Sequence, residues 1–105
     1  MTLTMVKTIL EELGVPLAYD HFAEGESPEP PFLIFTNPSD EGFGADNIVY
    51  AGFPEVNAEL YTDKKQPDLE KAFEAILDRH EIFYLKTETW IASEKLYEVL
   101  YELTL

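Results

Sequence analysis

The sequence contains no cysteine among its 105 residues. Disulfide bonds, thiolate metal sites and cysteine nucleophiles are therefore excluded together, and a reducing compartment is consistent with the absence. No apolar run approaches the roughly 20 residues that a membrane-spanning helix requires. The first residues also lack the basic start and the small-residue cleavage site of a signal peptide. We therefore expect a soluble, intracellular protein with no membrane partner.

Basic residues are scarce as well, because 7 lysines and arginines face 21 acidic residues and the formal net charge is −14. Such a surface repels nucleic acid, since binding to phosphates depends on cationic side chains that displace counterions. We expect no specific nucleic-acid binding. Solubility is the simplest explanation of the charge. Three sharper ones stay open: a surface that must not hold passing DNA, a mimic of DNA, and an acidic patch for a basic partner.

Apolar residues, by contrast, are plentiful at 46% of the chain, and aromatic residues alone make up 13%. This is enough to build a packed interior, which argues against disorder despite the charge. A chain of 105 residues is long enough for one hydrophobic core and too short for two. We therefore expect a single domain spanning residues 1–105.

Two segments have the periodicity of amphipathic helices. In residues 3–13 the apolar stripe can end at Gly14, which tolerates a left-handed conformation, and Pro16 prevents continuation; the stripe consists of Leu3, Val6, Leu10 and Leu13, widened by Met5 and Ile9. The second helix begins at Pro67, a residue suited to the first helical position, and ends near His80. Its predicted apolar face consists of Leu69, Ala72, Phe73, Ile76 and Leu77.

Strand character is found at residues 17–22, 32–36, 48–50, 56–62 and 83–91, where aromatic, β-branched or alternating residues are frequent. Segments 32–36 and 48–62 suggest a long β-hairpin with a protruding tip, interrupted at Pro54. Residues 93–105 fit both a helix and a strand, and their β-branched and aromatic residues favour the strand. The predicted order is α-β-β-β-α-β-β, an α+β fold with two helices packed on a mixed, mostly antiparallel sheet.

The two histidines do not suggest catalysis. His21 follows Asp20, but neighbouring residues of a strand point to opposite faces, so we expect no contact that would orient the imidazole. His80 lies at the end of the second helix, where a favourable interaction with the helix dipole explains it. The sequence also contains no histidine pair at the four-residue spacing typical of zinc sites.

The segment from residue 40 to residue 47 is rich in acids and glycines but matches no known ligand-binding pattern. The alternating oxygen ligands and terminal glutamate of a calcium-binding EF-hand loop are missing. Gly42 and Gly44 lack both the third glycine of a dinucleotide site and the Lys-Ser/Thr of a phosphate-binding loop. We therefore predict a non-enzymatic protein without cofactor or metal.

Aromatic residues on the expected hairpin are the more informative feature. Phe43, Tyr50 and Phe53 lie on or near its arm, together with Asp46. One interpretation is that the rings fold back onto the sheet. The other is that they are exposed and anchor a partner, since aromatic residues dominate the energetics of interfaces. These four residues form our candidate assembly interface.

Several stretches resemble small prophage proteins that are encoded among tail genes, and the similarity extends over nearly the whole chain. These are Leu13–Phe22 (LGVPLAYDHF), residues 28–32 (PEPPF), residues 59–65 (ELYTDKK) and residues 93–102 (SEKLYEVLYE). The order of elements is also similar to that of the tail terminator, or tail-completion, proteins of phages with long non-contractile tails. Those proteins form a hexameric ring that caps the tail tube and joins it to the head.

The resemblance implies a structural subunit with no catalytic residues. Its partners would be further copies of itself in a ring, possibly hexameric, the tail tube and the head connector. It would be found in the host cytoplasm during assembly and then in the virion tail. An acidic lining suits a ring through which DNA passes, because cationic walls would retain the duplex. The alternative is an acidic decoy that mimics DNA and occupies a host DNA-binding protein.

Overall fold

The structure is a computed structural model that describes residues 2–38 and 55–105. Within these residues, helices and strands follow one another as α1 (Leu3–Leu10), the 3-10 turn η1 (Glu11–Leu13), β1 (Leu17–Tyr19), β2 (Phe32–Thr36), β3 (Glu55–Thr62), α2 (Pro67–Arg79), β4 (Phe83–Ile91) and β5 (Leu96–Thr104). In the described part of the chain, neither helix is long and apolar enough to cross a membrane.

The strands form one mixed sheet with the spatial order β1-β2-β3-β5-β4. The short β1 runs parallel to β2, and every other neighbouring pair is antiparallel. At the centre of the sheet Leu60 of β3 lies between Leu33 of β2 and Val99 of β5. The predicted α+β class, the predicted element order and the strand at the C-terminus are confirmed.

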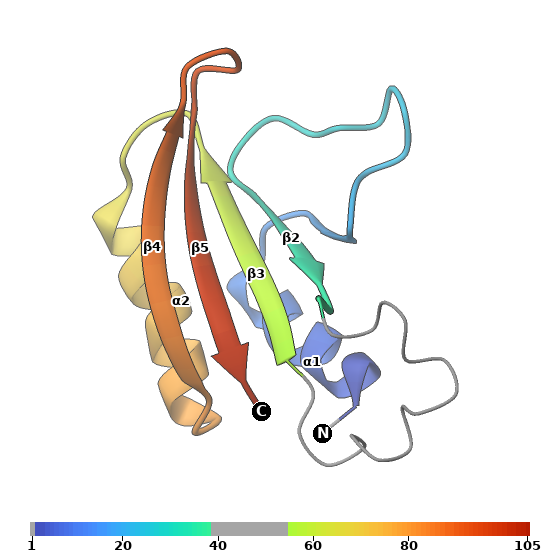
Figure 1. The fold of residues 1–105 in the computed structure, drawn as a ribbon, viewed down its shortest axis with the longest axis vertical. Coiled ribbons are helices and arrows are strands. Elements are labelled where there is room, and N and C mark those ends of the chain that lie inside the picture. The colour runs from blue at the N-terminus through green and yellow to red at the C-terminus, as the bar shows by residue number, and fades with distance from the viewer. Residues whose placement is uncertain (1, 39–54) are drawn as a thin grey trace.

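The molecule has two layers, because both helices cover the same face of the sheet (Figure 1). Side chains alternate along a strand, so in β3 every second residue is buried beneath the helices, among them Val56, Ala58 and Leu60. These residues join one continuous core with the buried residues of α1, α2, β2 and β5. The opposite face of the sheet is covered by no helix among residues 2–38 and 55–105, and we call it the open face.

α1 begins and ends as its sequence predicts. The hydroxyl of Thr2 accepts a hydrogen bond from the backbone N–H of Met5 at 3.1 Å and thereby caps the first turn. The helix tightens into η1 and ends at Gly14, whose φ of 83° is the left-handed value that favours glycine. The predicted apolar stripe is too wide, however: Ile9 is buried, but the Met5 side chain is 52% exposed.

α2 has Pro67 at its start, as predicted, and packs through Phe73, Ile76 and Leu77. The ring of Phe73 meets the ring of Tyr101 on β5 edge to face, with centroids 4.8 Å apart. Aromatic pairs in this geometry stabilise a core beyond the area that they bury. Ala72, which was expected on the packed face, is exposed.

A charged residue takes part in this interface too. Glu70 of α2 is only 4% exposed, and its carboxylate accepts hydrogen bonds from Lys65 at 2.7 Å and Lys86 at 2.9 Å. Lys86 also bonds to Glu74 at 2.6 Å, and Glu74 accepts the Tyr101 hydroxyl at 2.8 Å. Burial acts to raise the pKa of Glu70, but the two lysine hydrogen bonds outweigh it and hold this pKa below its usual value of 4.5.

One strand is shorter than predicted. The strand expected at residues 17–22 ends at Tyr19, because Asp20 has a left-handed φ of 68° that breaks the extended backbone. The hairpin of β2 and β3 is paired as expected, with Thr36 opposite Asn57. Its predicted tip and the predicted strand at residues 48–50 lie outside the described residues.

Replacing Leu60 with alanine tests the position of the core. Leu60 is fully buried at the centre of the sheet, so we expect Leu60→Ala to lower the free energy of unfolding by about 3 kcal/mol. Leu85→Ala is the matched control, because the Leu85 side chain is 57% exposed and its loss should cost about 0.5 kcal/mol or less. Urea denaturation followed by circular dichroism measures both. Equal losses would contradict the assigned core.

Glu70→Gln tests the charged contact between α2 and the sheet. Because the folded-state pKa of Glu70 is lowered, its contribution is present above pH 4.5 and is lost as the pH falls through the folded value. We expect Glu70→Gln to cost about 1–2 kcal/mol at pH 7, with a difference from the wild type that shrinks below pH 4.5. Glu88→Gln, which removes one half-exposed partner of Lys65, should cost less. A loss that is independent of pH would contradict the assignment.

Candidate functional site on the open face of the sheet

The candidate interface predicted from the sequence lies outside the described residues. This holds for all four of its members, Phe43, Asp46, Tyr50 and Phe53. The described residues nevertheless contain a surface with unusual chemistry, which is the open face of β2, β3 and β5. Sequence analysis did not single out this surface.

Four glutamates lie on the open face. Two of them, Glu55 and Glu59, lie on β3, and the other two, Glu98 and Glu102, lie on the neighbouring β5. No lysine or arginine in the described part of the chain forms an ion pair with any of them. The helix-covered side differs, because there Glu70 and Glu74 of α2 are paired with lysines. The open face is therefore a locally uncompensated negative surface.

The closest group of acids surrounds Tyr61. Its hydroxyl donates to Glu98 Oε2 at 3.0 Å and lies 3.4 Å from Glu59 Oε1, so the two carboxyls share one donor. Partial burial of Glu59 raises its pKa to about 7, and a hydrogen bond with Glu98, the charge of Glu98 and the charge of Asp20 act in the same direction. Burial and the two carboxylates also raise the pKa of Tyr61. Below a pH of about 7, Glu59 is therefore mostly protonated.

A hollow of about 290 Å³ adjoins this group of acids. Its walls come from three places: the strands β2 and β3, the loop between β1 and β2, and the turn between β4 and β5. The lining residues are His21, Phe22, Ser27, Phe32, Ile34, Tyr61, Ile91, Glu94 and Leu96. Three of its rings form a continuous row, since Phe22 meets Phe32 edge to face at 5.4 Å and Phe32 stacks on Tyr61 at 5.1 Å.

His21 at the rim of this hollow corrects one sequence expectation. Its Nδ1 lies 2.8 Å from Oδ2 of Asp20, although the two were expected on opposite faces of a strand. The contact forms because the strand ends at Tyr19 and the left-handed backbone of Asp20 turns both side chains to one side. Both are exposed, and the described residues include no group of three His, Asp or Glu side chains that could hold a metal ion.

His80 has a more specific partner than the helix dipole alone. Its Nε2 lies 2.8 Å from Oε2 of Glu12, and Arg79 pairs with the other oxygen of the same carboxylate. The hydrogen bond to His80 is the largest of the effects that lower the pKa of Glu12. Glu12 therefore links η1 to the end of α2, which is a structural role.

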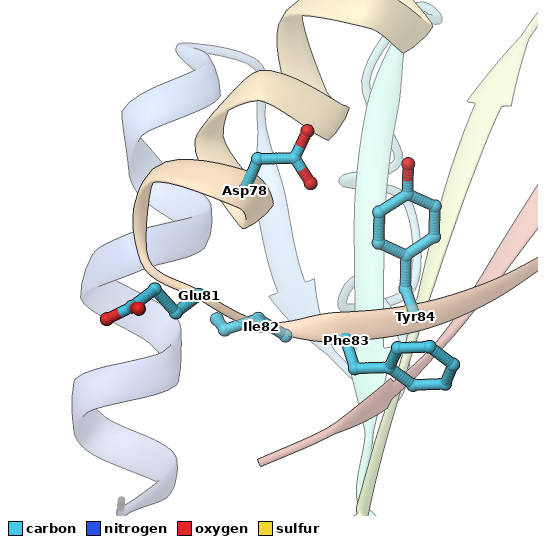
Figure 2. A pocket seen from close by; sticks show the side chains of 5 residues that line it. All are labelled: Asp78, Glu81, Ile82, Phe83 and Tyr84. Carbon is cyan, nitrogen blue, oxygen red and sulfur yellow. The ribbon is translucent and has the colours of Figure 1, made fainter.

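A second hollow, of about 540 Å³, lies at the turn from α2 into β4. Figure 2 shows that Asp78 and Tyr84 extend from the same side of the ribbon, whereas Glu81 and Phe83 extend in other directions. Glu81 therefore does not share the region into which Asp78 and Tyr84 extend. The exposed ring of Phe83 adds an apolar surface beside the hollow.

The outer edge of the sheet is the other exposed surface. β4 is the last strand, and it presents large apolar side chains to solvent, with Phe83 64%, Leu85 57% and Trp90 49% exposed. An outermost strand leaves backbone N–H and C=O groups free on one side, and these can pair with another strand. Inward-pointing charges such as Lys86 are a device by which natural edge strands avoid uncontrolled pairing.

Comparison of the chain with protein-family models, with curated proteins and with solved structures gives no significant match.

Glu59→Gln tests the state of the carboxyl pair. A carboxyl whose folded-state pKa is raised contributes stability below its unfolded value of 4.5, and this is lost as the pH rises through about 7. The glutamine side chain does not ionise in this pH range. We therefore expect the variant to have a free energy of unfolding about 1–2 kcal/mol higher than that of the wild type at pH 8, because solvent screens part of the effect. The gain should disappear near pH 4. Glu24→Gln, in the exposed loop, is the control, and an equal gain there would contradict the interpretation.

Proposed function

We propose that the chain is a non-enzymatic phage or prophage structural protein, a tail terminator or tail-completion subunit that caps the tail tube and joins it to the head. The observation that carries the proposal is the asymmetry of the two-layer fold. One face of the sheet is closed by helices, whereas the other face and the long edge of β4 are exposed. The resemblance to prophage tail-region proteins points in the same direction.

Ring assembly needs surfaces that meet head to tail between neighbouring subunits. The exposed edge of β4, with Phe83 and Leu85 beside it, is suited to such a contact because its backbone groups can extend a sheet across the interface. The uncompensated glutamates of the open face suit a surface past which DNA moves, because they provide no cationic side chain that would displace the counterions of the phosphates. The proposed location is the host cytoplasm during assembly and the virion tail afterwards.

The paired charges of the helix-covered side count against a DNA decoy. A decoy needs unpaired carboxylates that are spaced along its surface like the phosphates of DNA. On the helix-covered side, three glutamates are instead paired with lysines, namely Glu70, Glu74 and Glu88 with Lys65 and Lys86. Competition with DNA for host DNA-binding proteins would be the mark of that alternative.

Sedimentation velocity with and without assembled tail tube from the same prophage tests the proposal. We expect the isolated protein to sediment as a small species, and to co-sediment with tubes because it caps their ends. Negative-stain images of the mixture should show an added ring at one end of the tube. Tubes stripped of that end are the matched control. A protein that stays monomeric and does not bind the tube would contradict the proposal.

A further inference from the structure

The hollow on the open face combines an apolar aromatic floor with negative charge along one side. Phe32 and Tyr61 are stacked with an interplanar angle of 26°, and Ile34 continues the floor. The Tyr61 hydroxyl leads directly to the carboxyls of Glu59 and Glu98. The lining itself includes one carboxylate, that of Glu94, and the carboxyls of Glu59 and Glu98 adjoin the hollow through the Tyr61 hydroxyl. A ligand lying along the rings would therefore reach these two carboxyls at the Tyr61 end.

The charges that surround Glu59 are almost all negative. Tyr61 of β3, Glu98 of β5 and Asp20 of the loop act on it, whereas β2 contributes the apolar Ile34 opposite Glu59. Glu94 lies on the rim of the hollow with His21, and Lys95 follows in the same turn. No ion pair from His21 or Lys95 to Glu59 or Glu98 exists within the described residues, since His21 pairs with Asp20.

Desolvated carboxyls without a cation are costly, and a cation supplied from outside removes that cost. Of the available cations, arginine fits this hollow best. Its planar guanidinium stacks on aromatic faces, and its fork of donors can bond two carboxyl oxygens at once, which the point charge of lysine cannot. The aliphatic part of the side chain would cover the apolar floor.

The chain itself cannot easily provide this residue. Its single arginine is Arg79, which is already paired with Glu12 at the far end of α2. A second copy of the chain could insert only Arg79, and only by giving up its ion pair with Glu12. We therefore look for the occupant in a different protein.

We propose that the hollow between β2, β3 and the β4–β5 turn binds an arginine side chain presented by a partner protein, with the guanidinium held by Glu59 and Glu98 over the rings of Phe32 and Tyr61. The proposal does not depend on the phage assignment. Binding would displace the proton of Glu59, whose pKa is about 7, so affinity should rise between pH 6 and pH 8.

Titration of the ¹⁵N-labelled protein by NMR tests this with two short peptides, one with a single arginine between two leucines and one with lysine in its place. We expect shift changes centred on Tyr61, Glu59, Glu98 and the lining of the hollow, with the arginine peptide binding about fivefold tighter than the lysine peptide. Binding should be stronger at pH 8 than at pH 6.

Two double variants distinguish binding in this hollow from non-specific attraction to the negative surface. Glu59→Gln with Glu98→Gln should weaken the arginine peptide by about tenfold and abolish the pH effect. Glu55→Gln with Glu102→Gln removes the same charge from the same face and should change affinity by less than about twofold. Thermal melts verify that both variants fold. Equal weakening in the two variants, shifts spread over all acidic surfaces, equal binding of both peptides, or no shifts at about 10 mM peptide would each overturn the proposal.

Discussion

The rest of the structure depends on the packing of the Tyr101 side chain in the core. Its ring lies between Phe73 of α2 and Tyr84 of β4, with centroid separations of 4.8 and 5.5 Å, and it is fully buried. Its hydroxyl donates to Glu74, and Lys86 lies over the ring at 5.8 Å from the centroid. One side chain of the C-terminal strand thereby joins the helix layer, the outer strand and the lysine network. In the sheet, β5 lies between the central strand β3 and the edge strand β4.

The positions of the few lysine and arginine side chains decide on which face of the sheet the acidic side chains are paired. Four of the seven basic residues pair with acids of the helices or of their interface with the sheet, namely Lys7, Lys65, Arg79 and Lys86. Their pairing allows an acid as buried as Glu70 to remain ionised. The open face receives none of these four, so the burial of Glu59 is offset by a proton instead. Two similar side chains thus have pKa values displaced in opposite directions by their surroundings.

This asymmetry is consistent with a protein that works through its surfaces. The helix side stabilises the fold, whereas the open face and the edge of β4 remain available to partners. At the turn from α2 into β4, Glu81 extends away from Asp78 and Tyr84, and the Asp20–His21 pair is exposed. An interface that uses charge selects partners by electrostatic complementarity as well as by area.

The sequence by itself determined the α+β class, the order of the elements and most of their boundaries. Local signals are sufficient for this: the periodicity of residues 3–13, Gly14 and Pro67 at helix ends, and alternation in residues 56–62 and 83–91. Only the tertiary structure decided which acids are paired and which are not. Glu59 and Glu98 are 39 positions apart in the sequence. The register that places Tyr61 opposite Glu98 follows from the burial of Leu60 and Val99 on the other face. Likewise, no local pattern could reveal that Asp20 would leave the extended conformation and turn toward His21.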